Sequence, residues 1–295
     1  MTSAPADEFE RHRPRLFGLA YRMLGSAEEA EDTVQDAYLR FGRADRTEIE
    51  HPAAWLAKVV TNLCLNRLTS ARARREQYVG TWLPEPVATS DGTLGPLESA
   101  EQRDAVSMAM LLLLERLTPA ERAVYVLREA FGYGHREIAG VLDLTEANSR
   151  QLYRRAARRV SEPRPRFDPG PERREQLVAA FVAAAREGDL AGLEKLLAAD
   201  ATWWSDGGGK VSTARRPIEG REKVVRFTVG AFERFATGLE FTVAEVNGAA
   251  ALAAWSGDTL VAVAAFEVHD ELIAQVRAVL NPDKLDFVRR QLTRP

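Results

Sequence analysis

Residues 135–160 read HREIAGVLDLTEANSRQLYRRAARRV and hold the clearest structural signal in the chain. Apolar residues at helical spacing predict a short helix over 135–142 and a longer one from Thr145 to about Val160. Asp143-Leu144 supplies the turn between them, so the spacing predicts a helix-turn-helix. Just upstream, Thr118-Pro-Ala-Glu121 has the pattern of a capping box with proline at the first helical position, which predicts the start of a preceding helix.

The helix from Thr145 has one apolar seam and one arginine-rich face. The seam consists of Leu152, Tyr153, Ala156, Ala157 and Val160. A helix divided in this way suits the DNA major groove, where arginine pairs with guanine edges or phosphates. The residues expected to contact DNA are Ser149, Arg150, Gln151, Arg154, Arg155 and Arg158. The alternative is a solvated arginine face on a purely structural helix.

Residues 9–78 also have helical patterning. A capping box, Ser26-Ala-Glu-Glu29, follows Gly25 and opens a helix whose apolar face runs from Ala30 to Phe41. The opposite face is acidic and carries Glu28, Glu31, Asp32, Gln35 and Asp36. An exposed acidic surface of this kind can pair with a basic partner and steer its docking.

A third helix is expected to start near His51-Pro52 and to end in a basic segment. A pocket that reads unpaired bases needs aromatic and amide groups beside a basic edge. The candidates for this role are Trp55, Asn62, Asn66, Arg67, Arg72, Arg74 and Arg75. Trp55 also fits the helical core, and Asn62 also fits a local cap.

Composition excludes several protein classes. The formal net charge of −3 argues against a protein that coats nucleic acid indiscriminately. The N-terminus lacks a signal-peptide pattern and no apolar run reaches a membrane span, so the protein is expected to be cytoplasmic, with no membrane partner. The single cysteine, Cys64, excludes an internal disulfide and fits a small core position, and four scattered histidines predict no metal site.

Residues 9–160 together resemble the extracytoplasmic-function (ECF) sigma factors, which belong to the sigma-70 family. The resemblance rests on Ala30–Phe41, Ala54–Arg67 and the helix-turn-helix. It implies that the acidic helix, through Glu31, Asp32, Gln35 and Asp36, docks on the β′ clamp of core RNA polymerase, which also binds the factor through its β subunit. It further implies that the third helix reads the minus-ten promoter element and the helix-turn-helix the minus-thirty-five element.

The C-terminal part of the chain has a different pattern. Proline-rich residues 161–171 form a linker, two helices follow over 173–199, and short strands then alternate with glycine turns. The strands are expected over 240–246, 249–255, 259–268 and 272–280, in a curved antiparallel sheet of an α+β domain.

This part is similar to the SnoaL-like domains of the cone-shaped family that includes nuclear transport factor 2. Three short sequences, Trp82-Leu83-Pro84-Glu85-Pro86, Asp206-Gly207-Gly208-Gly209-Lys210 and Asn281-Pro282-Asp283-Lys284-Leu285, look like the signatures of the sigma subfamily that carries this fused domain. The resemblance implies a multidomain chain: a sigma-2 domain over 1–80, a linker over 81–100, a sigma-4 domain over 101–166 and a SnoaL-like domain over 167–295.

The hypothesis is an alternative sigma factor, with core RNA polymerase and promoter DNA as partners, whose C-terminal domain regulates it in cis in place of a separate anti-sigma protein. No cofactor and no catalytic residue are expected. One alternative is a C-terminal domain that senses a small ligand. Another is catalysis by His269, Asp270, Trp203 or Trp204. A third is a helix-turn-helix regulator that acts without polymerase, which the acidic helix argues against.

Overall fold

The computed structural model describes residues 5–89, 94, 105–160 and 170–292. The chain divides into two compact units, one of Met1–Gln77 with Asp91–Glu162 and one of Tyr78–Ser90 with Pro163–Pro295. The segment 78–90, which connects helical elements of the first unit along the sequence, therefore belongs to the C-terminal unit. We call this segment the linker. None of the helices in the described residues has the length together with the low polarity that a bilayer span demands.

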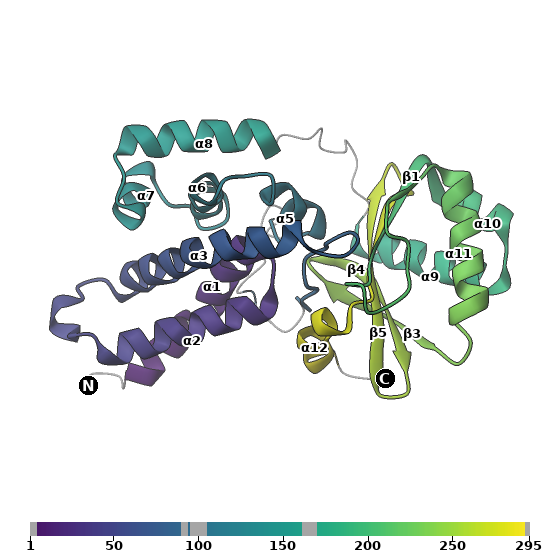
Figure 1. Ribbon diagram of the computed structural model, residues 1–295, viewed down its shortest axis with the longest axis horizontal. Coiled ribbons are helices and arrows are strands. Elements are labelled where there is room, and N and C mark those ends of the chain that lie inside the picture. Colours follow the sequence, from purple (N-terminus) through teal and green to yellow (C-terminus); the bar gives the residue numbers. More distant parts are fainter. Residues whose placement is uncertain (1–4, 90–93, 95–104, 161–169, 293–295) are drawn as a thin grey trace. The chain divides into compact units, whose positions relative to one another are not determined.

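The first unit is helical (Figure 1). Its elements are α1 (Pro5–Leu24), α2 (Ala27–Arg43), the 3-10 turn η1 (Arg46–Glu48), α3 (Pro52–Glu76), α5 (Met108–Leu114), α6 (Pro119–Glu129), α7 (His135–Leu142) and α8 (Glu146–Val160).

Local sequence signals explain why these helices begin and end where they do. Gly25 has a φ of 67° and ends α1, and the Ser26 hydroxyl accepts a hydrogen bond from the Glu29 amide at 3.1 Å to start α2. Thr118 and Glu121 form both halves of the expected capping box at the start of α6. The helix-turn-helix is confirmed, with Asp143 in the left-handed conformation between α7 and α8.

The second unit holds a six-stranded sheet with helices (Figure 1). Its elements are α9 (Pro171–Glu187), α10 (Leu190–Leu196), β1 (Leu197–Asp206), β2 (Ile218–Glu219), α11 (Arg221–Phe235), β3 (Glu240–Val246), β4 (Ala249–Ser256), β5 (Thr259–His269), β6 (Leu272–Val279) and α12 (Pro282–Gln291).

The sheet is mixed, which corrects the expected antiparallel sheet. The strand order is β2-β1-β6-β5-β4-β3, and β1 runs parallel to β6 while the other neighbours are antiparallel. Side-chain alternation within one strand carries no information about the direction of a distant partner strand, so the sequence could not show this pairing. The expected strands over 240–280 are confirmed as β3 to β6.

Helix α11 was not expected from the sequence. Its first residue follows Gly220, which has a φ of 94° and offers no side-chain cap. Its interior contains Val224, Val225 and Thr228, whose branched side chains favour strands when read alone. These three side chains are buried, so packing against the sheet makes this segment helical.

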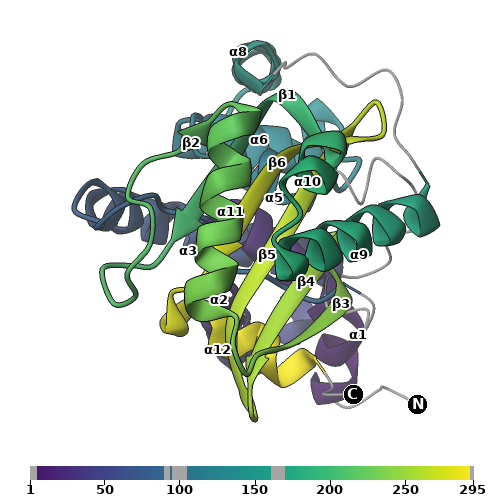
Figure 2. The same ribbon diagram turned by 90° about the vertical axis from the view of Figure 1, so that its right-hand side faces the viewer.

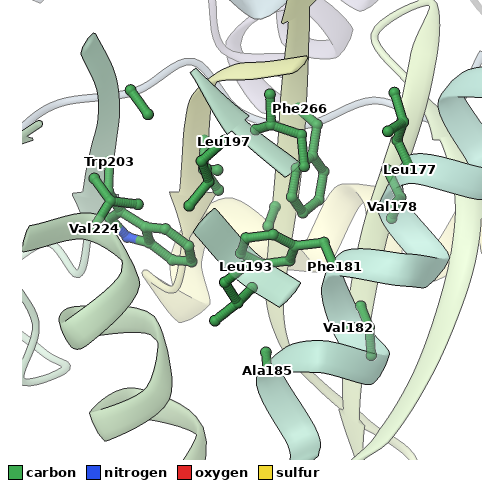
Figure 3. Packing of buried hydrophobic residues seen from close by; sticks show 14 of the residues in the cluster. Leu177, Val178, Phe181, Val182, Ala185, Leu193, Leu197, Trp203, Val224 and Phe266 are labelled. Carbon is green, nitrogen blue, oxygen red and sulfur yellow. The ribbon is translucent and has the colours of Figure 1, made fainter. Parts of the chain in front are cut away.

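The core of the second unit lies between one face of the sheet and helices α9, α10 and α11, which cover that face in Figure 2. Phe181 from α9 lies against Phe266 from β5, with ring centroids 5.3 Å apart. Trp203 from β1 packs edge-on against Phe227 from α11 at 5.4 Å. Figure 3 shows Phe181, Trp203 and Phe266 in one continuous apolar cluster. Bulky side chains therefore fill the space between the sheet and these helices.

The opposite face of the sheet is covered differently. Because side chains alternate along a strand, Asp206 points away from the face that carries Trp203. Helix α12 packs against β5, and Ala253, Val263 and Val279 are all buried. Residues 83–89, which belong to the segment 78–90, are also buried in this unit. This arrangement brings the three signature sequences together.

Candidate functional site

A buried polar cluster joins the three signature sequences. We call it the linker anchor and define it as Tyr78, Trp82, Leu83, Asp206, Asn281 and Lys284. Its members come from the segment before the sheet, from the end of β1 and from the start of α12. The structure brings side chains from all three signature sequences into contact within one unit.

Asp206 is the centre of the linker anchor and is completely buried. Its carboxylate accepts hydrogen bonds from the Tyr78 hydroxyl at 2.5 Å, the Leu83 amide at 2.8 Å and the Gly208 amide at 3.1 Å. The Lys284 ammonium lies 2.7 Å from the same carboxylate. A buried charge is tolerated only when it is paired and hydrogen-bonded. Lys284 and Gly208 supply part of this from the C-terminal domain itself, and the linker supplies the other two donors, Tyr78 and Leu83.

Lys284 is the cation of this pair, and its side chain is 8% exposed. Its ammonium donates a hydrogen bond to the Leu83 carbonyl at 2.6 Å. It also lies 4.7 Å from the centroid of the Tyr78 ring and 4.4 Å from that of the Trp82 ring. Cation–π attraction is strong at a site without water. Lys284 therefore contacts three linker residues at once.

Asn281 links the start of α12 to the linker. Its side-chain oxygen accepts the Asp283 amide, which caps the helix, and its side-chain nitrogen donates to the Tyr78 hydroxyl at 2.8 Å. Burial, together with the hydrogen bond to Asp206, raises the pKa of Tyr78 above its ordinary value of 10. The hydroxyl therefore stays protonated and able to donate at neutral pH.

The glycines after Asp206 are required by close approach. A Cβ atom at Gly208, whose φ is 59°, would lie 2.4 Å from the Asn281 side-chain nitrogen and 2.9 Å from the Tyr78 hydroxyl. A Cβ atom at Gly207 would lie 2.4 Å from the Val211 carbonyl oxygen. Only glycine lets the loop after β1 pass this close to the linker and to α12.

Lys210, the last residue of this glycine loop, forms an ion pair with Asp283 at 2.6 Å. Both side chains are more than half exposed, at 54% and 62%. Exposed pairs of this kind contribute little to stability because water screens them. Two Lys–Asp pairs thus connect the same two signature sequences: a buried one inside the linker anchor and an exposed one outside it.

Beyond the linker anchor, residues 87–89 extend the sheet at its β3 edge. The Val87 amide donates to the Asn247 side chain at 3.2 Å, and the Asn247 amide donates back to the Val87 carbonyl at 2.9 Å. The Thr89 amide donates to the Glu245 carbonyl at 3.2 Å. Backbone pairing of this kind recognises an extended segment by adding it to an exposed strand edge.

The remaining signature residues support this docking. Pro84, Glu85 and Pro86 are buried, as is Leu285 on the inner side of α12. Two prolines restrict the segment to an extended backbone and lower the entropy lost when it docks. Sequence reasoning missed Tyr78, Asn247, Glu245 and Gln291, because only tertiary contacts connect them to the signatures.

In the first unit, the exposed face of α8 is smaller than expected. Arg150, Gln151, Arg154 and Arg158 are exposed as expected. Ser149 corrects the prediction, because it is completely buried and its hydroxyl lies 3.1 Å from Nδ1 of His135. Ser149 lies beside the apolar seam of α8, so its side chain faces α7. A helical wheel of α8 alone does not show this contact.

Arg155 and Arg159 of α8 are held by Glu121 of α6. The buried Glu121 carboxylate lies 2.5 Å from Arg159 and 3.7 Å from Arg155. Burial acts to raise the pKa of Glu121, but hydrogen bonds from Thr118 and these two arginines outweigh it and lower that pKa. Arg155 therefore faces α6 as well as solvent, and the clear outer stripe of α8 is Arg150, Arg154 and Arg158.

The acidic face of α2 is at least partly exposed, as the sequence indicated, but three of its carboxylates are paired. Asp36 and Asp32 lie 2.9 Å and 3.7 Å from Arg67 of α3, a residue expected at the minus-ten element. Glu31 lies 2.7 Å from Arg13, and Gln35 is exposed. Ion pairs therefore connect Asp32 and Asp36, which are expected to bind polymerase, with Arg67, which is expected to bind DNA.

The other α3 candidates are distributed along the helix. Trp55 is half-buried with its ring 5.9 Å from that of Phe41, and Asn62 is half-buried, while Asn66 is exposed. Arg75 bonds to Glu115 and to the Leu24 carbonyl and is half-buried. Arg72 and Arg74 belong to α3, but their side chains lie outside the described part of the chain.

The candidate catalytic residues of the C-terminal domain do not converge. Trp203 is in the core, where its indole donates to Ser205, and Trp204 points to the other face of the sheet. His269 lies 2.9 Å from Glu267, and Asp270 lies in the turn between β5 and β6 with a φ of 49°. Within the described ranges, no group of metal-ligating side chains is found.

Comparison with family models matches three parts of the chain. Residues 9–74 match Sigma-70 region 2, residues 107–160 match Sigma-70 region 4 and residues 178–280 match the SnoaL-like domain. The order of the three matches agrees with the order of the elements described above.

Relatives match nearly the whole chain. The ECF RNA polymerase sigma factor SigJ of Mycobacterium tuberculosis is 39% identical over 94% of this chain and 92% of its own length. Probable ECF RNA polymerase sigma factor SigI of the same species is 32% identical over 95% and 94%. The crystal structure of SigJ superposes with a TM-score of 0.74 at 35% identity, covering 96% of this chain and 98% of that one. The chain therefore belongs to the ECF RNA polymerase sigma factors that carry a C-terminal SnoaL-like domain.

Proposed function

We propose that this alternative sigma factor directs core RNA polymerase to specific promoters and that its SnoaL-like domain controls promoter use in cis by binding the linker between regions 2 and 4. The observation that carries the proposal is the linker anchor. A C-terminal domain with no role in regulation would not need a buried ion pair that linker residues contact.

The docked linker sets the sign of the effect. Reading two promoter elements at once requires region 2 and region 4 to reach separate positions on DNA. The docked segment 78–89 would span roughly 40 Å if fully extended, at about 3.3 Å per residue. Docking on the C-terminal domain fixes the path of this segment, so the segment can no longer adjust to the separation of the two promoter elements. The docked state therefore restrains promoter binding, and release favours it.

Exposed surfaces of the first unit make the polymerase and DNA contacts. Core polymerase meets the acidic face of α2 through Glu31, Asp32, Gln35 and Asp36, which are at least partly exposed. The minus-ten element meets the α3 candidates named above. The minus-thirty-five element meets the outer stripe of α8 with Gln151, because a row of guanidinium groups fits the major groove.

The C-terminal domain acts here as a binding module and not as an enzyme. Supporting this, Phe181, Trp203, Phe227 and Phe266 occupy the interior where a cone-shaped enzyme would hold its substrate. A small-ligand sensor is the second candidate, and a cavity beside the linker favours it, as argued below.

Transcription by purified core polymerase on a promoter library tests the proposal. Lys284→Met, which breaks the buried pair, is expected to raise promoter-specific transcript yield above that of the full natural chain. Lys210→Met, which breaks the exposed pair between the same two sequences, is the matched control and should leave the yield near that of the natural chain.

Equal yields from the two variants would refute linker control, and no polymerase-dependent initiation at all would refute the sigma role. The assay contains no other protein, so it also tests whether control needs a separate anti-sigma factor. Because the proposed partners are core polymerase and promoter DNA, the proposed place of action is the bacterial cytoplasm.

A further inference from the structure

A cavity of about 250 Å³ lies beside the linker anchor in the C-terminal unit. One wall is formed by Val79 and Gly80 of the linker, and the rest by residues of β1 and of the loop after it. The lining is Val79, Gly80, Ser205, Gly207, Gly209, Val211, Ser212, Thr213, Ala214 and Arg215. We propose that this cavity binds a small organic anion, a carboxylate on a short apolar body, and that the bound anion stabilises the docked linker.

The polar side chains that line the cavity can all donate a hydrogen bond. Ser205, which is 2% exposed, accepts a hydrogen bond from the Trp203 indole at 2.8 Å, so its hydroxyl hydrogen remains available to an acceptor in the cavity. Ser212 and Thr213 add hydroxyl groups and Arg215 adds a guanidinium. A ligand that satisfies this set must be rich in acceptors, and a carboxylate matches a guanidinium through two parallel hydrogen bonds.

The electrostatics favour a negative charge. The lining contains no carboxylate. The two carboxylates of the neighbouring signature sequences are occupied, because Asp206 is paired with Lys284 and Asp283 with Lys210. Within the described part of the chain, Arg215 has no ion pair of its own. An anion would therefore meet a cation that no acidic side chain neutralises.

The apolar part of the lining indicates the rest of the ligand. Val79 and Val211 are 53% and 38% exposed, which is high for valine, and Ala214 lies beside them. A short aliphatic body would cover these side chains and remove apolar surface from water. A bare inorganic anion would leave them exposed, so an amphipathic anion fits the cavity better.

The position of the cavity couples it to the linker. A Cβ atom at Gly209 would lie 3.2 Å from the Val79 side chain, so the loop and the linker already meet at this wall. The ligand can touch both walls only while Val79 and Gly80 are docked. By linkage, ligand binding and linker docking then stabilise each other to the same degree. This part of the inference rests on the proposed function.

Isothermal titration of the full chain tests the site, with hexanoate as the probe and hexanamide as its neutral counterpart. Hexanoate is expected to bind at least about tenfold more tightly than hexanamide, since a charge-assisted pair is lost in the amide. Removing methylene groups toward acetate should weaken binding about fourfold for each CH₂. Inorganic phosphate should bind more weakly than hexanoate.

Arg215→Gln should weaken hexanoate binding at least about tenfold. Arg216→Gln changes the neighbouring exposed arginine, which does not line the cavity, and serves as the control. Three outcomes would overturn the site: no hexanoate binding at millimolar concentrations, equal binding of hexanoate and hexanamide, or equal affinities of the two arginine variants. Phosphate binding as tight as that of hexanoate would overturn the apolar assignment.

Lys284→Met separates the site from its coupling to the linker. Release of the linker removes one wall, so this variant should bind hexanoate more weakly than Lys210→Met does. Equal binding by the two lysine variants would overturn the coupling while leaving the anion site in place. Conversely, normal hexanoate binding with no transcriptional effect of Lys284→Met would overturn linker control and not the site.

Discussion

Replacing Lys284 by methionine should release the linker from the C-terminal domain without unfolding that domain. The substitution keeps the apolar stem against the Tyr78 and Trp82 rings but removes the ammonium from the buried Asp206. Removing one partner of a buried pair costs about 3–5 kcal/mol. Asp206 keeps three hydrogen-bond donors in the variant, so the lower end, about 3 kcal/mol, is expected.

Hydrogen exchange of linker amides measures this change. At 1.4 kcal/mol per tenfold, a loss of about 3 kcal/mol corresponds to exchange faster by about 100-fold. The amides to follow are those of Leu83, Val87, Ala88 and Thr89, which all bond to the C-terminal domain. Amides of the central strands β5 and β6 should keep their protection and show that the domain stays folded.

Lys210→Met provides the control for this experiment. Its pair with Asp283 is more than half exposed on both sides, and such pairs are worth about 0.2–1 kcal/mol. Linker exchange in this variant should therefore rise by no more than about fivefold. Equal linker exchange in the two variants would show that the buried pair does not hold the linker, and the energetic reasoning would fail.

Three further outcomes are expected. Gly208→Ala should loosen the linker to a similar extent, since its Cβ would collide with the linker anchor, and linker exchange unchanged by this variant would contradict the steric argument. Burial, with a contribution from Arg128, lowers the pKa of His135 below 6.5, so the folded state binds fewer protons and the free energy of unfolding should fall as the pH drops below that value. Urea denaturation of the natural chain and of His135→Gln would show this, because the variant should lose that part of the pH dependence. Arg154→Gln should reduce the salt dependence of promoter binding by the holoenzyme by about one unit of slope, whereas Arg159→Gln should mainly lower the thermal stability of region 4.

Local signals in the sequence identified most of the helical unit. The capping boxes at Ser26 and Thr118 and the left-handed turn at Asp143 act within a few residues, so they can be recognised without a partner. The same holds for the strands β3 to β6, which are separated by two-residue turns. Helix α11 and the parallel pairing of β1 with β6 depend on distant contacts and were not recognisable.

The candidate site divides in the same way. The sequence by itself determined which short segments matter, through their unusual composition and their resemblance to known signatures, and it placed Lys284 and Asp206 in them. It did not show that these two residues form one buried pair closed by the linker, or that Tyr78 and Asn247 take part. Burial likewise removed Ser149 from the expected DNA face. Hydrogen bonding and burial between residues from different elements arise only when the chain has folded, and for that reason only the tertiary structure could decide them.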